Sequence, residues 1–422
     1  MSKNSVTHLD RRTIIKAAAL AGAAQIASPF VWSARAADTV KIGLDNPLTG
    51  TFAALGKNEL IGAQLAVDKI NAAGGILGKK VELLVEDSTS TDAAVAVQKA
   101  AKLVEGDKVN FLIGNINSGL AQAMANYSNE KGVFHIVPGG HTDSVTGSQC
   151  HWNVFRVCNT TRMETNSVSQ LLLNSYGRRW YFITTDYAFG HALQVGFEAT
   201  LQQTAGGTEL GADFTPLGTT DFSANLIKAQ STSPDAIILL LAGDDMINCL
   251  KQAVQFGLDK KTHIAGAQQE LEVLEGLPPQ ALIGDWVFEW YWKQPGVPHV
   301  AEFVADVRKR SGGKVPTART WFGFAAIQSC KLAAEKAKSL DPLKLAKAMQ
   351  GLVLPPEVAL MQNNPFYRIG DNQLMPTLFV GHSQQAPAGG DPEDLFAVTN
   401  QMKGTDAALP VGQNGCKMVW PS

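Results

Sequence analysis

The chain has 422 residues, of which 45% are hydrophobic and 18% are charged, and its formal net charge is −2. This composition excludes disordered and fibrous proteins, and the length exceeds that of one ordinary core, so we expect two folded lobes. The small net charge and the lack of basic runs in the folded part argue against nucleic acid as a partner.

Residues 1–36 are typical of an export signal. Arg11 and Arg12 precede an alanine-rich, weakly hydrophobic run that ends in Ala-Arg-Ala, a small-residue cleavage pattern that favours a cleaved signal over a membrane anchor. The order Arg-Arg-Thr-Ile-Ile-Lys resembles a twin-arginine (Tat) signal, but Asp10 stands where Ser or Thr is usual, which leaves the ordinary secretory route open. We expect cleavage near Ala36 and a periplasmic location. Loss of five basic residues and one acidic residue then changes the formal net charge from −2 to −6.

Short apolar runs alternate with helix-length segments in the first half of the mature chain. The order predicts a parallel sheet with helices on both faces. The expected strands and the helices between them are, in order, residues 39–44, 58–75, 80–87, 91–106, 109–114, 119–132 and 133–140.

The same alternation returns in the second half and predicts a second lobe of the same kind. Two such lobes direct the carboxyl ends of their strands toward a shared gap, which is a common place for a small-molecule site. The expected strands and helices are residues 179–185, 189–207, 208–214, 222–230, 235–241, 244–257 and 263–267.

The remainder of the chain is less regular. A strand at residues 286–292 and helices at residues 298–311, 319–339 and 342–351 are expected. The last 60 or so residues are rich in Pro, Gly and Gln, so we expect them to cross between the lobes and wrap the surface.

Five cysteines lie in the mature chain, and export brings them to an oxidising compartment. Cys150 and Cys158 bracket a strand-like stretch whose seven extended residues hold them roughly 25 Å apart, beyond the ~7 Å limit between bridged Cα atoms. One of these two is therefore expected to pair with Cys416, and we favour Cys150. Cys249 and Cys330 fall on apolar helix faces and are expected to be buried free thiols.

Motifs of the common cofactor and catalytic sites are absent from the sequence. There is no dinucleotide-binding Gly-x-Gly-x-x-Gly, no phosphate-binding loop, no Gly-x-Ser-x-Gly, no His-Glu-x-x-His and no Cys-x-x-Cys. The eight histidines are scattered, without zinc spacing. We therefore expect a protein that is not an enzyme and that needs no cofactor or metal.

Several stretches resemble one family. The run "AVDKINAAGGILGKKVEL", the helix entry "TSTDAAVAV" and the later "FLIGNINSGLAQAMANYSNEKGVFHIVPGG" are similar to the Leu/Ile/Val-binding family of periplasmic solute-binding proteins of ABC importers. The resemblance covers nearly all of the mature chain. It implies a type I clamshell of two Rossmann-like α/β lobes joined by three crossovers, which closes on a ligand by hinge motion. The N-terminal lobe would comprise residues 37–157 and 287–365, and the C-terminal lobe with the tail residues 158–286 and 366–422.

The resemblance also implies a cradle for a ligand carboxylate in the loops after the third and fourth strands. The matching residues are Asn117, Ser118, Gly139, Gly140 and His141. The alternative is that Asn117 or Ser118 only caps the helix that follows. If Ser118 binds ligand, Ser118→Ala is expected to weaken binding without changing the stability of the empty protein.

The chain departs from the family's amino-acid binders in the second lobe. Gln268 and Gln269 stand where an acidic residue is expected to pair with the ligand ammonium, and an amide cannot neutralise a buried cation. Glu270 or Asp244 could substitute, but the simpler interpretation is that the ligand need not be a zwitterion.

Three further positions match the family's pocket wall. Leu55 stands where an aromatic residue is usual, and Phe189 matches the lid aromatic of the second lobe. Arg319 could pair with a second ligand carboxylate or lie against a ring, or it could be an ordinary arginine at a helix start.

From these observations the sequence predicts a monomeric solute receptor. It would bind a small carboxylate- or amide-bearing molecule, first a branched-chain or related amino acid and next an aromatic or aliphatic acid, and deliver it to an ABC permease. The alternative is a periplasmic sensor that uses the same lobes to pass a signal to a receptor.

Overall fold

The computed structural model describes residues 39–421, and the expected export signal with its cleavage site lies outside them. In the first lobe, five parallel strands form a sheet in the order β2-β1-β3-β4-β5. The strands are β1 (Val40–Asn46), β2 (Val81–Asp87), β3 (Phe111–Ile113), β4 (Phe134–Val137) and β5 (Val154–Arg156).

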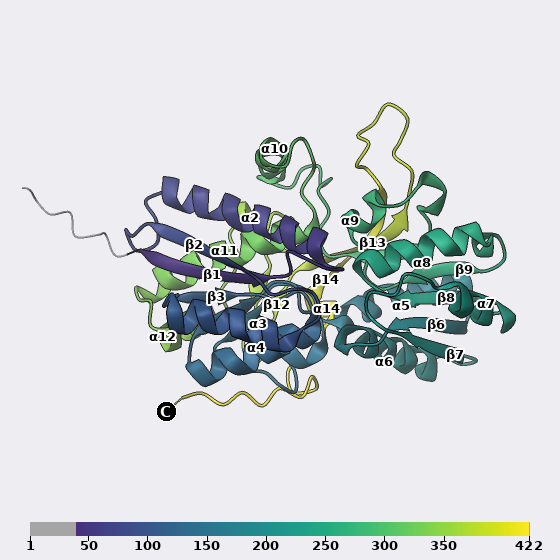
Figure 1. Cartoon of the computed structure of the whole chain (residues 1–422), viewed down its shortest axis with the longest axis horizontal. Helices are drawn as coiled ribbons and strands as arrows, with labels where there is room; N and C mark the ends of the chain where they lie inside the picture. Colours follow the sequence, from purple (N-terminus) through teal and green to yellow (C-terminus); the bar gives the residue numbers. More distant parts are fainter. Residues whose placement is uncertain (1–38, 422) are drawn as a thin grey trace, which may run out of the picture. The chain divides into compact units, whose positions relative to one another are not determined.

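Helices cover both faces of this sheet, as the alternation of elements predicts (Figure 1). Phe111 and Ile113 point into the main core with α2 and α11, whereas Leu112 points into a smaller cluster with α3 and α4, as expected for alternating strand residues. The helices of this lobe are α2 (Ala53–Ala72), α3 (Ala93–Ala101) with a π-helical turn at Lys102–Gly106, α4 (Ser118–Lys131), α10 (Val300–Arg310), α11 (Ala318–Ala337), α12 (Pro342–Met349) and α13 (Pro356–Ala359).

The second lobe repeats the plan with four parallel strands in the order β7-β6-β8-β9. The strands are β6 (Arg179–Thr185), β7 (Thr208–Thr215), β8 (Ala236–Leu240) and β9 (His263–Gly266). The helices are α5 (Thr161–Tyr176), α6 (Ala188–Gln203), α7 (Ser223–Ser231), α8 (Gly243–Gln255) and α9 (Leu271–Glu275).

Helix α5 is the longest element that the sequence did not predict. Its first half is rich in Thr and Ser, residues that favour turns, and it lacks a clear apolar stripe. Thr160 caps the helix by accepting the N–H of Met163 at 3.0 Å. Val168 and Leu172 then pack it against β6 and α6, so tertiary burial outweighs the weak local signal.

A third, antiparallel sheet has the order β10-β13-β14. Two expectations need correction here. The strand expected at residues 286–292 ends at Phe288, because Trp290 turns into the core of the first lobe and donates its indole N–H to Leu360 O at 2.8 Å. The last 60 residues do not only wrap the surface; they include β11 (Phe366–Tyr367), β12 (Leu374–Met375), β13 (Thr377–Ser383) and β14 (Phe396–Lys403), with α14 (Gly404–Ala407), and β13 pairs with β10 (Asp285–Phe288).

The chain passes between the two lobes three times. The first passage joins β5 to α5, the second follows β10 up to Trp290, and the third joins Leu374 of the first core to Leu378 of the second. These three passages, which we call the hinge, are the arrangement expected for a two-lobed clamshell.

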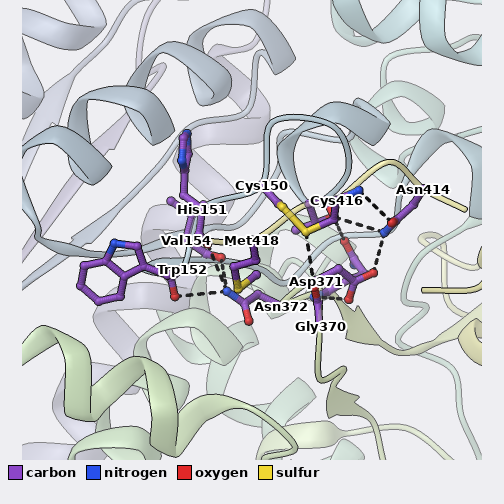
Figure 2. Close-up of a disulfide and its surroundings, with 12 residues drawn as sticks. Cys150, His151, Trp152, Val154, Gly370, Asp371, Asn372, Asn414, Cys416 and Met418 are labelled. Atoms are coloured by element: carbon purple, nitrogen blue, oxygen red, sulfur yellow. Dashed lines mark hydrogen bonds between the residues drawn. A yellow bond between two sulfur atoms is a disulfide. The ribbon is translucent and has the colours of Figure 1, made fainter. Parts of the chain in front are cut away.

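A disulfide joins Cys150 to Cys416, with the Cα atoms 5.5 Å apart, so the preferred pairing is confirmed (Figure 2). Two hydrogen bonds lie beside the disulfide. Asn414 Nδ2 donates to Thr146 O at 3.3 Å and so also holds the C-terminal segment, and Asn372 Nδ2 donates to Val154 O of β5 at 3.0 Å. The other three cysteines, Cys158, Cys249 and Cys330, are buried free thiols. Among residues 39–421 no helix has the length and apolar character needed to cross a bilayer.

Candidate functional site

The loops after β3 and β4 carry the candidate residues at the carboxyl ends of their strands. Asn117 is the N-cap of α4: its side-chain oxygen accepts the N–H groups of Gly119 at 2.8 Å and Leu120 at 3.3 Å, and its Nδ2 donates to Ser90 O at 3.0 Å. The capping alternative therefore describes Asn117, whose side-chain oxygen serves the helix.

Ser118 is buried and joins the two loops, because its hydroxyl oxygen accepts the N–H of Thr142 at 3.1 Å. This contact corrects the expectation for Ser118→Ala. Alanine would leave the N–H of Thr142 without its acceptor inside the protein, which costs about 1–3 kcal/mol, so the empty protein would also lose stability.

The loop after β4 allows a close approach of side chains. A Cβ atom at Gly139 would lie 2.3 Å from Arg319 Nη1 and 2.8 Å from Glu59 Oε1. A Cβ atom at Gly140 would lie 2.4 Å from Ala121 Cβ. Gly139 thus leaves room for a charged pair, whereas Gly140 leaves room for helix α4.

Three charged side chains form what we call the arginine group: Glu59, Glu270 and Arg319. Arg319 donates to Glu270 Oε1 from Nε at 2.7 Å and also from Nη2, and its Nη1 donates to Glu59 Oε1 at 3.3 Å. Glu59 and Arg319 come from α2 and α11 of the first lobe, and Glu270 precedes α9 of the second. Arg319 therefore ties the lobes together and is already paired, which differs from the expectation that it could take a ligand carboxylate.

A second set, which we call the histidine group, contains His141, Glu164 and Glu289. His141 Nε2 lies 2.6 Å from Glu289 Oε2 and 3.8 Å from Glu164 Oε1. Glu289 Oε1 accepts the backbone N–H of Asn159 at 2.6 Å. Gln268 links the two groups, since its Nε2 lies 3.1 Å from both Glu270 Oε1 and Glu289 Oε2.

Burial and charge dominate the electrostatics of these groups. Burial raises the pKa of Glu59 to about 7, although Arg319 opposes the shift. Burial, with the charge of Glu289, raises the pKa of Glu164 well above its usual value. Burial alone would lower the pKa of Arg319, but Glu270 and Glu59 raise it. Four carboxyl groups thus share one guanidinium and one imidazole.

Some buried polar atoms in this region have no hydrogen-bond partner within the described chain. They include both carboxyl oxygens of Glu164, Oε2 of Glu270 and Nε2 of Gln269. Buried polar groups in native proteins are almost always satisfied, so these atoms are available to hydrogen-bond a polar ligand or to bind an ion.

Apolar side chains line the rest of the region. Leu55 packs with Phe52 and Ile116, and Tyr187 of the second lobe covers this cluster. Phe189 and Phe322 flank the imidazole of His141, with ring centroids 5.8 and 6.3 Å away. The site therefore combines an acidic interior with aromatic walls.

The structure brings most of the candidates together but not all of them. Asp244 is exposed in the first turn of α8 and lines a separate hollow with Thr51 and Gly218. The sequence did not single out Glu59, Glu164 or Glu289. A signal was present for two of them: Glu59 interrupts an apolar helix face and Glu289 interrupts the apolar run "WVFEWYW", whereas Glu164 lies on the helix that was not predicted.

Comparison with known proteins agrees with this architecture. Residues 39–388 match a family model described as a periplasmic binding protein. The chain belongs to the periplasmic binding protein family. Among the relatives of this periplasmic binding protein, a Leu/Ile/Val-binding protein homolog 1 of Brucella melitensis is 28% identical over 313 residues, 74% of this chain and 82% of that protein. The Leu/Ile/Val-binding protein BraC3 of Rhizobium johnstonii is 35% identical over 201 residues, 47% of this chain and 53% of that protein, so this match spans about half of the relative.

A solved structure has the same fold. The amino acid ABC transporter substrate-binding protein of Pseudomonas fluorescens Pf-5 superposes with a TM-score of 0.79 at 25% identity, covering 90% of this chain and 99% of that one. This periplasmic binding protein thus has the type I architecture of two α/β lobes that the sequence predicts, and the two charged groups lie where the lobes meet.

Proposed function

We propose that this protein captures a small amino-acid-like solute between its two lobes in the periplasm and delivers it to an ABC permease. The ligand class is a carboxylate- or amide-bearing molecule with an amino group, first a branched-chain or related amino acid. The observation that carries the proposal is the buried polar cluster, which draws side chains from both lobes and in which several polar atoms have no partner among residues 39–421.

The charge of the cluster favours an amino group on the ligand. Arg319 is occupied by Glu270 and Glu59, while Glu164 has no hydrogen-bond partner within the described residues. An ammonium group would supply positive charge and N–H donors to such a carboxylate. Although Gln268 replaces the acid usual in the family, Glu164 and Glu289 bring carboxyl groups to the same place from other elements.

The carboxylate or amide end of the ligand would contact the hydroxyl of Ser118 and the loop at Gly139 and Gly140. Ser118 is the first residue of α4, and a helix N-terminus favours a negative charge. Binding can drive closure only if the ligand prefers the closed state, and contacts to both lobes provide that preference.

A second candidate ligand is an aromatic acid, because Phe189 and Phe322 flank His141. An acid without an amino group would add negative charge beside four carboxyl groups, so we rank it below amino acids.

A thermal-unfolding screen of the signal-free protein tests the proposal. The compounds are amino acids, their amides, and benzoate-type acids of matched size. A ligand at a hundred times its Kd adds about 2.7 kcal/mol to the free energy of unfolding. We expect leucine-like amino acids to raise the unfolding temperature more than the matched acids that lack the amino group. Stabilisation by the acids alone would favour the second candidate, and turnover of any compound would contradict a binding function.

A further inference from the structure

The histidine group contains a carboxyl group whose surroundings the solute-binding proposal does not fully explain. Glu164 is 0% exposed, both of its oxygens lack a hydrogen-bond partner within residues 39–421, and Oε1 lies 3.8 Å from His141 Nε2. A buried carboxyl group without a donor is costly in either protonation state. Its position beside His141 shows where a positively charged partner would be placed.

The imidazole of His141 lies directly against this set of carboxyl groups. Its Nε2 lies 2.6 Å from Glu289 Oε2, while the two N–H groups of Gln268 Nε2 are used by Glu270 Oε1 and Glu289 Oε2, each at 3.1 Å. An imidazole nitrogen without a proton has a lone pair that can bind a cation, and the neighbouring carboxylates can bind the same cation.

The geometry of the three side chains fits such an ion. His141, Glu164 and Glu289 each offer one ligand atom, and these three atoms lie within 4.8 Å of one another. An imidazole nitrogen with two carboxylate oxygens is a donor set suited to Zn²⁺ rather than to Ca²⁺ or Mg²⁺, which prefer oxygen alone. The carboxylate of Glu289 is also fixed in orientation, because its other oxygen accepts the N–H of Asn159 at 2.6 Å.

We propose that His141, Glu164 and Glu289 bind a divalent cation of the zinc type. The three residues come from the loop after β4, from α5 and from the passage after β10. The ion would therefore connect the first lobe, the second lobe and the hinge, and would favour the closed state. The site uses the same carboxyl groups, Glu164 and Glu289, as the proposed function, so a bound ion would take the place of the ligand ammonium, and the metal is tested in the absence of solute.

Zn²⁺ titration of the EDTA-treated, signal-free protein tests the site without any organic solute. We expect one tightly bound Zn²⁺ per chain by calorimetry and a higher unfolding temperature with the metal. Glu164→Gln keeps the shape but removes the charge, and should weaken Zn²⁺ binding at least roughly tenfold. The metal-free Glu164→Gln protein should be as stable as the metal-free wild type or more stable, because it no longer buries an unpaired carboxyl group.

His191→Asn is the matched control. His191 and Asp186 form an exposed pair at 2.8 Å, which is the kind of site that binds Zn²⁺ adventitiously. The control should retain the tight site. Absence of stoichiometric binding, wild-type affinity in Glu164→Gln, or loss of binding in His191→Asn would each overturn the proposal.

The solute screen in EDTA separates this inference from the proposed function. If Glu164→Gln abolishes solute binding while the wild type binds no Zn²⁺, then Glu164 serves a ligand ammonium and the metal site is wrong. If Zn²⁺ binds as expected but no solute does, the metal site stands and the proposed function fails.

Discussion

Arg156 and Arg319 are both buried beside the loop at residues 139–142, yet their partners differ in kind. Arg156 donates to neutral acceptors only: Gln373 Oε1 at 2.6 Å, Gly140 O at 3.0 Å, Thr142 O at 2.6 Å, and Thr146 Oγ1. Arg319 donates mainly to carboxylates, and one of them belongs to the other lobe.

We expect a structural role for Arg156 and a role in ligand binding for Arg319. Arg156 is the last residue of β5, and its partners lie in the loop after β4 and in the segment before β12, so it is expected to fix the shape of that loop in any state of the protein. Arg319 joins the lobes, so its pairing with Glu270 depends on closure. Loss of Arg156 should therefore lower stability, and loss of Arg319 should lower ligand affinity.

The largest expected effect is that of Arg156→Met on stability. Four buried hydrogen bonds of the guanidinium are lost, and at about 1 kcal/mol each the free energy of unfolding falls by about 4 kcal/mol. Urea unfolding of the ligand-free protein measures it. Arg310→Met is the control, because Arg310 pairs with the exposed Asp68 at the surface and should cost less than about 1 kcal/mol. Equal losses of unfolding free energy in Arg156→Met and Arg310→Met would contradict the structural role of Arg156.

Removal of the disulfide tests how much the link between the C-terminal segment and the first lobe contributes to stability. Cys150 and Cys416 are 266 residues apart in the sequence, and the double change to Ser should lower the free energy of unfolding by about 3 kcal/mol. Wild-type protein reduced with dithiothreitol should match the double variant in urea unfolding. An unchanged unfolding midpoint after reduction would show that the hydrogen bonds of Asn414 suffice to hold the C-terminal segment around Cys416.

Arg319→Gln sharpens the functional side of the comparison. In an open state Arg319 and Glu270 would face solvent, so the ligand-free protein should lose less stability than Arg156→Met does. Ligand affinity should fall roughly a hundredfold, about 2.7 kcal/mol, because the closed state would bury Glu270 without its partner. Calorimetry with the best compound of the screen measures it. A large loss of stability in Arg319→Gln with unchanged ligand affinity would show that Arg319 is structural and would contradict its role in ligand binding.

The smallest effect is the pH dependence that Glu59 confers. Its pKa is raised by burial to about 7 in the folded protein, above that of an exposed glutamate, so the folded state binds the proton more tightly. The stabilisation is present below the unfolded-state pKa and is lost as the pH rises through about 7, a decrease of about 2 kcal/mol between about pH 5.5 and pH 7.5. Asp45, whose pKa is raised by burial to about 8, acts in the same direction.

Glu59→Gln isolates the contribution of Glu59 to the pH dependence of the unfolding free energy. Unfolding free energies of the variant and the wild type at several pH values should differ in slope, with the variant declining less between about pH 5.5 and pH 7.5. Parallel curves would show that Glu59 keeps an ordinary pKa beside Arg319.

Local pattern was enough for most of the fold. Alternation of apolar strands and helical segments predicted eight of the nine parallel strands of the two sheets, and the strand-like stretch between Cys150 and Cys158 indicated the ninth, β5. The pattern failed at α5, whose first half looks like a turn, and at the C-terminal strands, whose pairing with β10 depends on residues far away in the sequence.

The candidate site was predicted less completely than the fold. Sequence reasoning placed His141, Gln268 and Arg319 in one region, where the structure also has them. It left Arg319 open between a ligand carboxylate, a ring and an ordinary helix start, and it offered Glu270 or Asp244 as a substitute acid. In the structure Arg319 pairs with Glu270 and Glu59, and Asp244 is exposed.

The sequence by itself determined the two-lobed α/β architecture and the family, and it excluded a bridge between Cys150 and Cys158, because periodicity, motifs and the reach of an extended chain are local properties; the pairing of Cys150 with Cys416 was decided by the structure. Only the tertiary structure decided which charges meet in the cleft. Glu59, Glu164, Glu270 and Glu289 lie on four separate elements, and the energy of a buried charge depends on neighbours that the fold, not the order of residues, brings within a few ångströms.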